Sequence, residues 1–230
     1  MIFITGDTHR DFSRIEFFCK RNKTSKDDVM IILGDAGINI LSEEEDYYFK
    51  KYLARLPITL FCIHGNHEMR PHHRKEYTTE RLFHGGFAYS DPRFPNQFFA
   101  LDGQRYDFDG RKCLVIGGAY SVDKEIQQRR GRWWDDEQPD DTIKEYVEHV
   151  LAFEGWKQDV ILTHTCPYKY LPRECFLPGV DQSKVDNSTE RWLDTIEDRC
   201  DYNKWYCGHF HTDKVIDKMR FLSTDIIELR

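Results

Sequence analysis

Short apolar runs, each followed by a polar motif, restrict the fold of this chain more than any other feature. The runs are rich in β-branched and aromatic side chains, and most end in Gly, His or Asp, so they are predicted to be strands. They are Ile2–Thr5, Val29–Leu33, Thr59–Ile63, Cys113–Ile116, Val160–Thr163 and Trp205–Cys207. Continuous hydrophobicity is typical of strands buried on both faces. The strands are therefore expected inside a layered fold.

Amphipathic helices are predicted between these strands. Ser42 and Glu45 form a capping-box pattern before an apolar stripe, and Pro57 is expected to end that helix. Asp140 is predicted to cap a second helix, and Asn187 with Glu190 to open a third. Helices that alternate with strands predict a mixed, layered α/β (α+β) fold.

Two hairpins and one domain are also expected. The hairpins pair 214–217 with 220–223, and 98–101 with 106–108. A length of 230 residues fits a single domain, 1–230. Two polar, weakly periodic segments, at about 69–96 and 121–140, are expected to be lid-like loops, because long irregular stretches in a compact domain are usually functional.

Composition excludes some classes of partner. The net charge is −7, so a basic face for long nucleic acid is not expected, although a nucleotide as a small substrate is compatible. Seven cysteines without a CxxC pair indicate reduced thiols in a cytoplasmic protein. The start of the chain is predicted to be a strand rather than a signal peptide, and no apolar stretch is long enough for a membrane span.

Polar motifs directly follow five of the apolar runs. They are Asp7-Thr8-His9, Gly34-Asp35, Gly65-Asn66-His67-Glu68, His164, and Gly208-His209-Phe210-His211. In layered α/β folds, ligands gather beyond the carboxyl ends of the strands. The five motifs are therefore expected to converge on one site.

The side chains of these motifs suit divalent transition metals. Imidazole and carboxylate together favour zinc, iron, manganese or nickel over calcium. Seven side chains can fill two coordination spheres if one carboxylate bridges: Asp7, His9, Asp35, Asn66, His164, His209 and His211. Two divalent cations, two carboxylates and a bridging hydroxide leave a net charge of about +1, which attracts a phosphate.

Each motif also has a simpler interpretation. An Asp-x-His at a strand end is often a turn beside a surface histidine, Gly-Asp is a common turn, and a lone His164 would be a core residue. Gly-Asn-His-Glu and Gly-His-x-His carry more weight, because a turn alone does not explain their histidines. All five motifs in this order, each after an apolar strand, favour the metal site.

A cluster of arginines and tryptophans lies after the Cys113–Ile116 run. It consists of Arg129, Arg130, Arg132, Trp133 and Trp134. Arginine forks suit phosphate and indole suits a base or aromatic leaving group, so these residues are candidates for substrate binding on a lid. A solvated turn with its tryptophans packed in the core is an equal alternative.

Together, the five motifs resemble those of the calcineurin-like metallophosphoesterase superfamily, over residues 5 to 211. The resemblance implies a four-layer sandwich of two mixed β-sheets flanked by helices, with two divalent metal ions (Mn, Fe, Zn or Ni, and Mn first). It implies that one metal binds Asp7, His9 and His211, that the other binds Asn66, His164 and His209, and that Asp35 bridges them. The catalytic set would be Asp35, His67, which contacts the phosphate and protonates the leaving group, and Glu68, which orients the His67 ring.

The sequence departs from the protein phosphatase branch of that superfamily. That branch follows Gly-Asp with a segment ending in Asp-Arg-Gly and places an arginine before Gly-Asn-His-Glu. Here Ala36 follows Gly34-Asp35, and His64 precedes Gly65. The segment 117–124, followed by Trp133-Trp134, is similar to stretches in uncharacterised bacterial and phage members. A protein phosphatase of that branch is therefore not expected.

The expected activity is hydrolysis of a phosphomonoester or phosphodiester by a metal-bridging hydroxide, with His67 as general acid. The expected substrate is a small phosphate ester such as a nucleotide. An alternative is a non-catalytic adaptor or scaffold on the same fold, which would usually have lost metal ligands or the catalytic histidine. A zinc hydrolase of another fold would need a different ligand order. The sequence leaves metal identity and oligomeric state open.

Overall fold

All six apolar runs form strands in a computed structural model that describes residues 1–77 and 79–229. In spatial order, the first sheet contains β13 (Ile226–Glu228), β1 (Ile2–Thr5), β2 (Val29–Ile32), β3 (Thr59–Cys62), β6 (Gln97–Ala100), β5 (Gly86–Ser90) and β4 (Thr79–Phe83). The second contains β11 (Lys214–Ile216), β12 (Met219–Phe221), β10 (Asp201–Cys207), β9 (Lys157–Thr163), β8 (Arg111–Ile116) and β7 (Arg105–Phe108). Both sheets are mixed, with parallel central strands and antiparallel outer ones.

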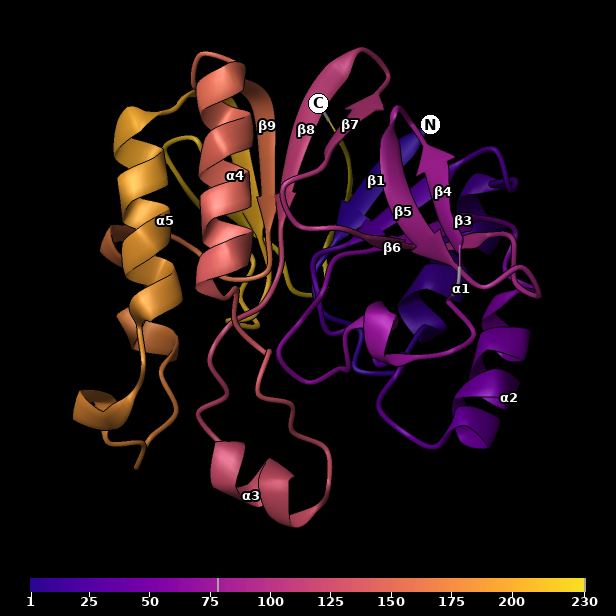
Figure 1. The fold of residues 1–230 in the computed structure, drawn as a ribbon. Coiled ribbons are helices and arrows are strands. Elements are labelled where there is room, and N and C mark those ends of the chain that lie inside the picture. Colours follow the sequence, from indigo (N-terminus) through magenta and orange to yellow (C-terminus); the bar gives the residue numbers. More distant parts are fainter. Residues whose placement is uncertain (78, 230) are drawn as a thin grey trace.

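Helices cover the outer face of each sheet. They are α1 (Ser13–Asn22), α2 (Glu43–Leu53), α3 (Lys124–Arg129), α4 (Asp141–Phe153) and α5 (Ser188–Arg199), with short 3₁₀ turns at Pro71–His73, Tyr168–Tyr170, Arg173–Cys175 and Gln182–Lys184. Figure 1 shows α4 and α5 beside the second sheet, α1 and α2 beside the first, and α3 projecting from one edge. The predicted fold, two mixed sheets flanked by helices, is confirmed.

Three apolar layers hold the sandwich together. Between the sheets, Phe61 and Val115 belong to one buried cluster. A second cluster joins Met30 to Ile15 of α1, and a third packs Leu193 of α5 against the second sheet. Because successive strand residues point to opposite faces, a central strand in this arrangement must be apolar throughout. That requirement explains the continuous apolar runs of the sequence.

Two helices begin where their capping residues predict. The Ser42 hydroxyl accepts a hydrogen bond from the Glu45 backbone N–H at 3.3 Å, and the Glu45 carboxylate accepts one from the Ser42 N–H at 3.3 Å. This capping box starts α2, which ends at Leu53, before Pro57 is reached. Asp140 caps α4 through a 2.8 Å bond to the N–H of Ile143.

The third helix, α5, begins directly after Asn187 as predicted, but neither Asn187 nor Glu190 caps it through its side chain. The Asn187 amide donates to the carbonyl of Val185 at 3.0 Å, and Glu190 accepts from the Thr165 hydroxyl at 2.7 Å. Both side chains are therefore engaged away from the helix N-terminus. The tertiary contact with Thr165 outweighs the local capping pattern.

One hairpin is confirmed and the other is wrong. β11 and β12 pair antiparallel, as predicted. The strands predicted to pair at 98–101 and 106–108 form as β6 and β7 but lie in different sheets, where β6 pairs with β3 and β7 with β8. Phe98 and Phe108 both belong to the apolar cluster between the sheets. The Asp102-Gly103 turn therefore carries the chain from one sheet to the other.

The two segments expected to be irregular contain regular structure. Within 69–96, β4 and β5 form a hairpin, and Ala88 of β5 pairs with Ala100 of β6. Leu82 and Phe87 of this edge hairpin are 68% and 49% exposed. Because these large apolar side chains are not the buried ones, the sequence pattern does not reveal the two strands. Residue 78 lies outside the described residues. Within 121–140, α3 is a short helix and the remainder is irregular.

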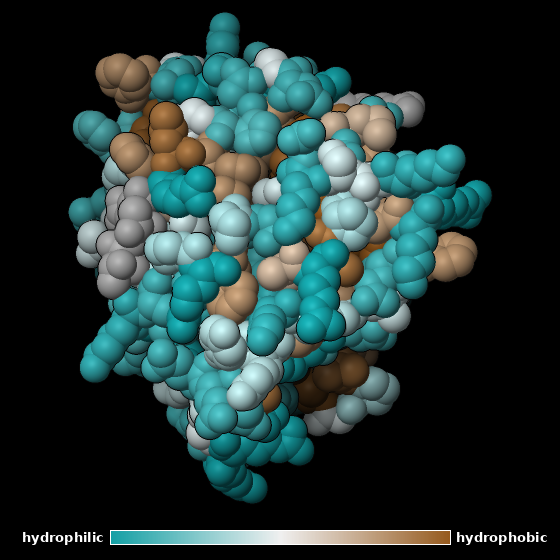
Figure 2. All heavy atoms as spheres, turned by 90° about the vertical axis from the view of Figure 1, so that its right-hand side faces the viewer, coloured by the Kyte–Doolittle hydropathy of each residue, from teal (hydrophilic) through white to brown (hydrophobic). Residues whose placement is uncertain are grey.

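The surface agrees with the charged composition. The face that carries α2 is mainly hydrophilic, with apolar side chains scattered over it (Figure 2). Within residues 1–77 and 79–229, no helix combines the length and apolar character needed to cross a membrane. All seven cysteines are free thiols, and six are buried, among them Cys62, Cys113 and Cys207, which lie inside apolar runs.

Candidate metal centre

The polar motifs converge where the parallel strands of both sheets end. β1, β2 and β3 end at the same edge of the first sheet, and β9 and β10 at the facing edge of the second. The backbone N–H of His209 donates to Asp7 Oδ1 at 2.9 Å, and His164 Nε2 lies 2.8 Å from Asn66 Oδ1. The two sheets thus meet through the predicted metal ligands.

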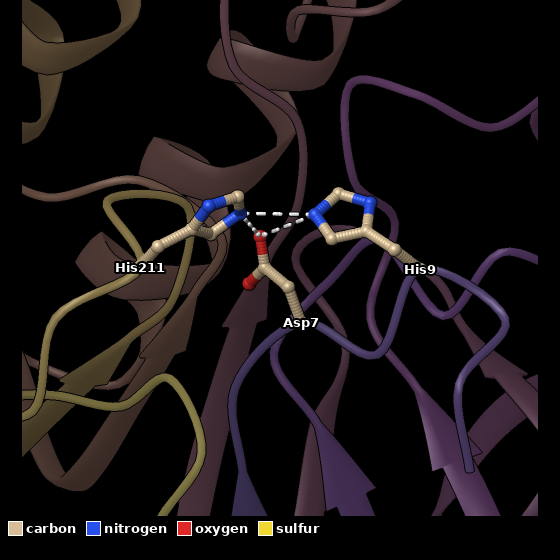
Figure 3. A group of neighbouring side chains, drawn as sticks. All are labelled: Asp7, His9 and His211. Carbon is tan, nitrogen blue, oxygen red and sulfur yellow. Dashed lines mark hydrogen bonds and ion pairs between the residues drawn. The ribbon is translucent and has the colours of Figure 1, made fainter. Parts of the chain in front are cut away.

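Asp7, His9 and His211 form the first group. Figure 3 shows the two imidazoles approaching one carboxylate oxygen. Asp7 Oδ2 lies 3.6 Å from His9 Nε2 and 3.3 Å from His211 Nε2, and the two nitrogens are 2.9 Å apart. This oxygen is buried and accepts no hydrogen bond from the described residues. Three electron-pair donors around a buried carboxylate suit a divalent cation.

Asp35, Asn66 and His164 form the second group. His164 is fully buried, and its Nδ1–H donates to the carbonyl of Leu33 at 2.7 Å, which leaves Nε2 as an acceptor in the neutral ring. That nitrogen faces Asn66 Oδ1 at 2.8 Å and Asp35 Oδ2 at 3.8 Å. The amide of Asn66 donates to Ser121, so its oxygen is free to act as a ligand. Three acceptors face one another here, and a cation would satisfy them all.

Asp35 lies between the two groups. Its Oδ2 is 4.0 Å from His9 Nδ1 and 3.8 Å from His164 Nε2. Its Oδ1 accepts the backbone N–H of His67 at 2.9 Å. The side chain is only 2% exposed, so its position is fixed. Asp35 Oδ2 therefore lies within 4.0 Å of a histidine nitrogen on either side.

The electrostatics favour ligands in their metal-binding protonation states. Burial opposes ionisation of Asp7, but His211, His164 and the N–H of His209 bring the pKa of its carboxyl well below the usual range. Burial, together with His164, lowers the pKa of His209, and burial also lowers that of His9. His211 is an exception, because its contact with Asp7 raises its pKa. Neutral imidazole and ionised carboxylate are the forms that bind metals.

Four of the seven predicted ligands adopt a left-handed backbone conformation. They are His9, Asp35, His209 and His211, with φ between 44° and 66°. Residues other than glycine rarely adopt this conformation, and such strain concentrates at functional sites. The strands therefore end in sharp turns that aim these side chains at one another.

Two glycines make room for the carboxylates. A Cβ at residue 65 would lie 2.0 Å from Asp35 Oδ1, and one at residue 208 would lie 2.4 Å from Asp7 Oδ1. Since real Cβ contacts are never that short, a side chain at either position would displace a predicted ligand. Gly65 and Gly208 thus allow the close approach of the two carboxylates.

We expect Gly65→Ala to destabilise the protein by about 3 kcal/mol, because the added methyl group overpacks against Asp35. Gly85→Ala is the control, since a Cβ there meets no atom within 4 Å and only its left-handed conformation costs about 1 kcal/mol. Urea unfolding measures both. Equal destabilisation by the two variants would contradict the close approach at Gly65.

His67 has a different neighbour from the one predicted. Glu68 was expected to orient the His67 ring, but its carboxylate accepts the N–H groups of Gly65 at 3.0 Å and Gly37 at 3.2 Å. Burial and the nearby Asp35 raise the pKa of Glu68. The carboxylate that faces the ring is Asp123, whose Oδ1 lies 3.9 Å from His67 Nε2. The predicted orienting role of Glu68 is therefore wrong. Glu68 instead links the loop after β2, through Gly37, to the loop after β3, through Gly65.

The arginines and tryptophans predicted to bind substrate lie elsewhere. Arg129 ends α3, is exposed and pairs with Glu125, while Trp133 packs under the ammonium group of Lys124. A cavity of about 460 Å³ opens beside Asp35, Asn66, His67, His209 and His211. None of Arg129, Arg130, Arg132, Trp133 and Trp134 is among the described residues that line it.

Residues 171–187 form much of that cavity wall, and sequence reasoning did not identify them. One sequence feature could have indicated these residues. The stretch between β9 and α5 is long and contains apolar residues without helix or strand periodicity, which is typical of a functional loop. Arg14 was also missed. Its guanidinium donates to the backbone carbonyls of Gly6 and Asp7 at 2.9 and 2.6 Å and thereby supports the first ligand loop.

The histidines that follow Glu68 closely in sequence form a separate cluster. His73 Nε2 lies 2.8 Å and His72 Nε2 3.7 Å from Asp136 Oδ2. Arg70 binds Asp102 and also reaches Asp136. Both histidines are exposed.

Comparison with known proteins identifies the family of this chain. The sequence profile described as calcineurin-like phosphoesterase matches residues 1–213. The chain belongs to the calcineurin-like phosphoesterase family. The predicted resemblance is therefore confirmed. Family membership implies metal-dependent hydrolysis of phosphoesters, and the groups around Asp7 and Asp35 can hold divalent metal ions.

Solved structures support the same fold. A crystal structure of TT1561 of Thermus thermophilus is similar, with a TM-score of 0.54 and 12% identity, over 96% of this chain and 87% of that one. A second crystal structure has a TM-score of 0.50 and 13% identity, over 96% of this chain and 89% of its own. No curated protein matches the sequence. At these identities the likeness shows a shared fold alone, and the substrates of these neighbours are not transferable.

Proposed function

We propose that this chain is a dinuclear metal-dependent phosphoesterase that hydrolyses a small phosphomonoester or phosphodiester. The observation that supports this most directly is the position of Asp35 Oδ2, within 4.0 Å of a nitrogen from each ligand group. One oxygen shared by two groups of ligands is the arrangement that a bridged pair of metals requires.

Asp7, His9 and His211 would hold one ion, and Asn66, His164 and His209 the other. When bound, such ions supply Lewis-acid activation of water and offset the charge of the phosphoryl oxygens. Manganese, iron, zinc and nickel all suit a mixed imidazole and carboxylate site. Manganese is proposed first among them.

His67 is proposed as the residue that protonates the leaving group. It lines the cavity beside the ligand cluster, and its ring is 29% exposed, so a substrate oxygen can reach it. Asp123 faces its Nε2 and can stabilise the protonated ring. Asp35, by accepting the His67 backbone N–H, couples the position of this histidine to the ligand cluster.

Metal analysis combined with an ester screen tests the proposal. We expect about two bound metal ions per chain, and hydrolysis of at least one class among phosphomonoesters, phosphodiesters and cyclic nucleotides with Mn, Zn or Ni added. Removal of the metals by a chelator should abolish turnover, and re-addition should restore it. Two bound ions without hydrolysis of any ester would favour the non-catalytic adaptor instead.

A further inference from the structure

The cavity beside the ligand cluster is lined by two chemically different sets of side chains. One set belongs to the ligand cluster and consists of Asp35, Asn66, His67, His209 and His211. The other set is mainly apolar and includes Tyr120, Leu171, Phe176, Leu177, Val180 and Val185, together with the polar Gln182, Asp186, Asn187 and Glu190. At about 460 Å³, the cavity has the size of a small-molecule site.

Most of the apolar lining comes from one stretch of chain. Residues 164–187 link β9 to α5 (Figure 1), and the side chains at 171, 176, 177, 180 and 185 line the cavity. Leu177 is still 61% exposed. Exposed apolar side chains that face a cavity gain free energy when a ligand covers them. Because the phosphate must lie at the ligand cluster, the organic part of the same molecule would cover this wall.

The charged groups of the cavity disfavour a second phosphate. The described residues that line it include Asp186 and Glu190, but no lysine or arginine. A further phosphate beyond the reacting one would meet carboxylates without a compensating cation. The bound metal ions would offset the charge of the reacting phosphoryl group alone.

Glu190 offers one polar contact within this surface. It is 4% exposed, its Oε1 accepts the Thr165 hydroxyl at 2.7 Å, and its Oε2 is buried without a hydrogen bond to any described residue. Burial raises the pKa of this carboxyl to about 7, so above that pH it is ionised and both of its oxygens act only as acceptors. A buried carboxyl oxygen without a partner is a ready acceptor for a donor on a ligand.

We infer that the substrate is an ester of a single phosphate with a compact, apolar organic group that carries a hydrogen-bond donor. The apolar wall at 171–185 binds the organic group, and Glu190 accepts the donor. This inference rests on the proposed function. It narrows the substrate class by disfavouring nucleoside polyphosphates, bisphosphates and phosphoproteins.

Calorimetry with non-hydrolysable phosphonates tests the inference without turnover. We expect the metal-loaded protein to bind 3-phenylpropylphosphonate about tenfold or more tightly than propylphosphonate, because the phenyl ring buries apolar surface. Phe176→Ala should remove most of that preference and leave propylphosphonate binding unchanged. Phe153→Ala is the matched control, since Phe153 is 84% exposed on α4 and outside the cavity lining.

A ring hydroxyl tests Glu190. Glu190→Gln should weaken the binding of 3-(4-hydroxyphenyl)propylphosphonate several-fold. The variant should still bind 3-phenylpropylphosphonate more tightly than propylphosphonate. Equal affinity of the two simple phosphonates, or an equal loss for both in Phe176→Ala, would overturn the inference. If the protein binds 3-phenylpropylphosphonate more tightly than propylphosphonate but hydrolyses no ester, the proposed activity is refuted, while the inferred apolar binding site is supported.

Discussion

Asp35→Asn should reduce metal content below two ions per chain and lower kcat/KM about 10³-fold or more. Asparagine has nearly the same size and can still accept the N–H of His67, so the local fold should persist. It lacks the charge and the second carboxylate oxygen that lies between His9 and His164. A bridged metal pair contributes several kcal/mol to stabilisation of the transition state, which corresponds to this loss in rate.

Metal analysis by mass spectrometry and ester kinetics would measure this effect. Asp27→Asn is the control, because Asp27 is an exposed aspartate in the turn before β2. Thermal unfolding of both variants separates loss of metal from loss of fold. An Asp35→Asn protein that keeps two ions and full activity would rule out the bridge.

The strands and the ligand motifs could be predicted because their signals are local. A central strand between two packed layers must be apolar throughout, so runs such as Val29–Leu33 are visible in the sequence. The residues after such strands are then held at one edge of the sheet. The convergence of Asp7 and Asp35 follows from the parallel pairing of β1 with β2, and His164 joins them because β9 lies in the second sheet, which packs against the first.

The edges of the sheets could not be predicted in the same way. β4 and β5 carry exposed apolar residues such as Leu82 and Phe87, so their composition does not reveal which face is buried. The pairing of β7 with β8 rather than β6 depends on which sheet the chain enters after Gly103. That choice is made by packing between distant segments.

Partners of buried polar side chains were also beyond sequence reasoning. Glu68 follows His67 directly, yet its carboxylate turns to the backbone of Gly37 and Gly65. Asp123, which faces His67, comes from a different segment. Spacing along the chain suggests neighbours for a side chain, but loop packing selects the actual one.

The second large effect is expected for His67→Ala, which should retain two metal ions and lose about 10²- to 10⁴-fold in kcat. His67 belongs to neither ligand group, so metal binding does not need it. If it donates a proton, the loss must depend on the leaving group. An alkyl phosphate, whose alcohol leaves poorly, should lose far more than p-nitrophenyl phosphate, whose phenolate leaves readily.

This dependence separates proton donation from a purely structural role, which would reduce both rates by the same factor. His149→Ala is the control, because His149 is an exposed histidine on α4. Asp123→Asn should produce a weaker form of the same pattern, since Asp123 acts through the ring at 3.9 Å rather than on the substrate. Equal losses for the alkyl and nitrophenyl esters in His67→Ala would remove His67 as the acid, and Asp123 would then lose its proposed positioning role.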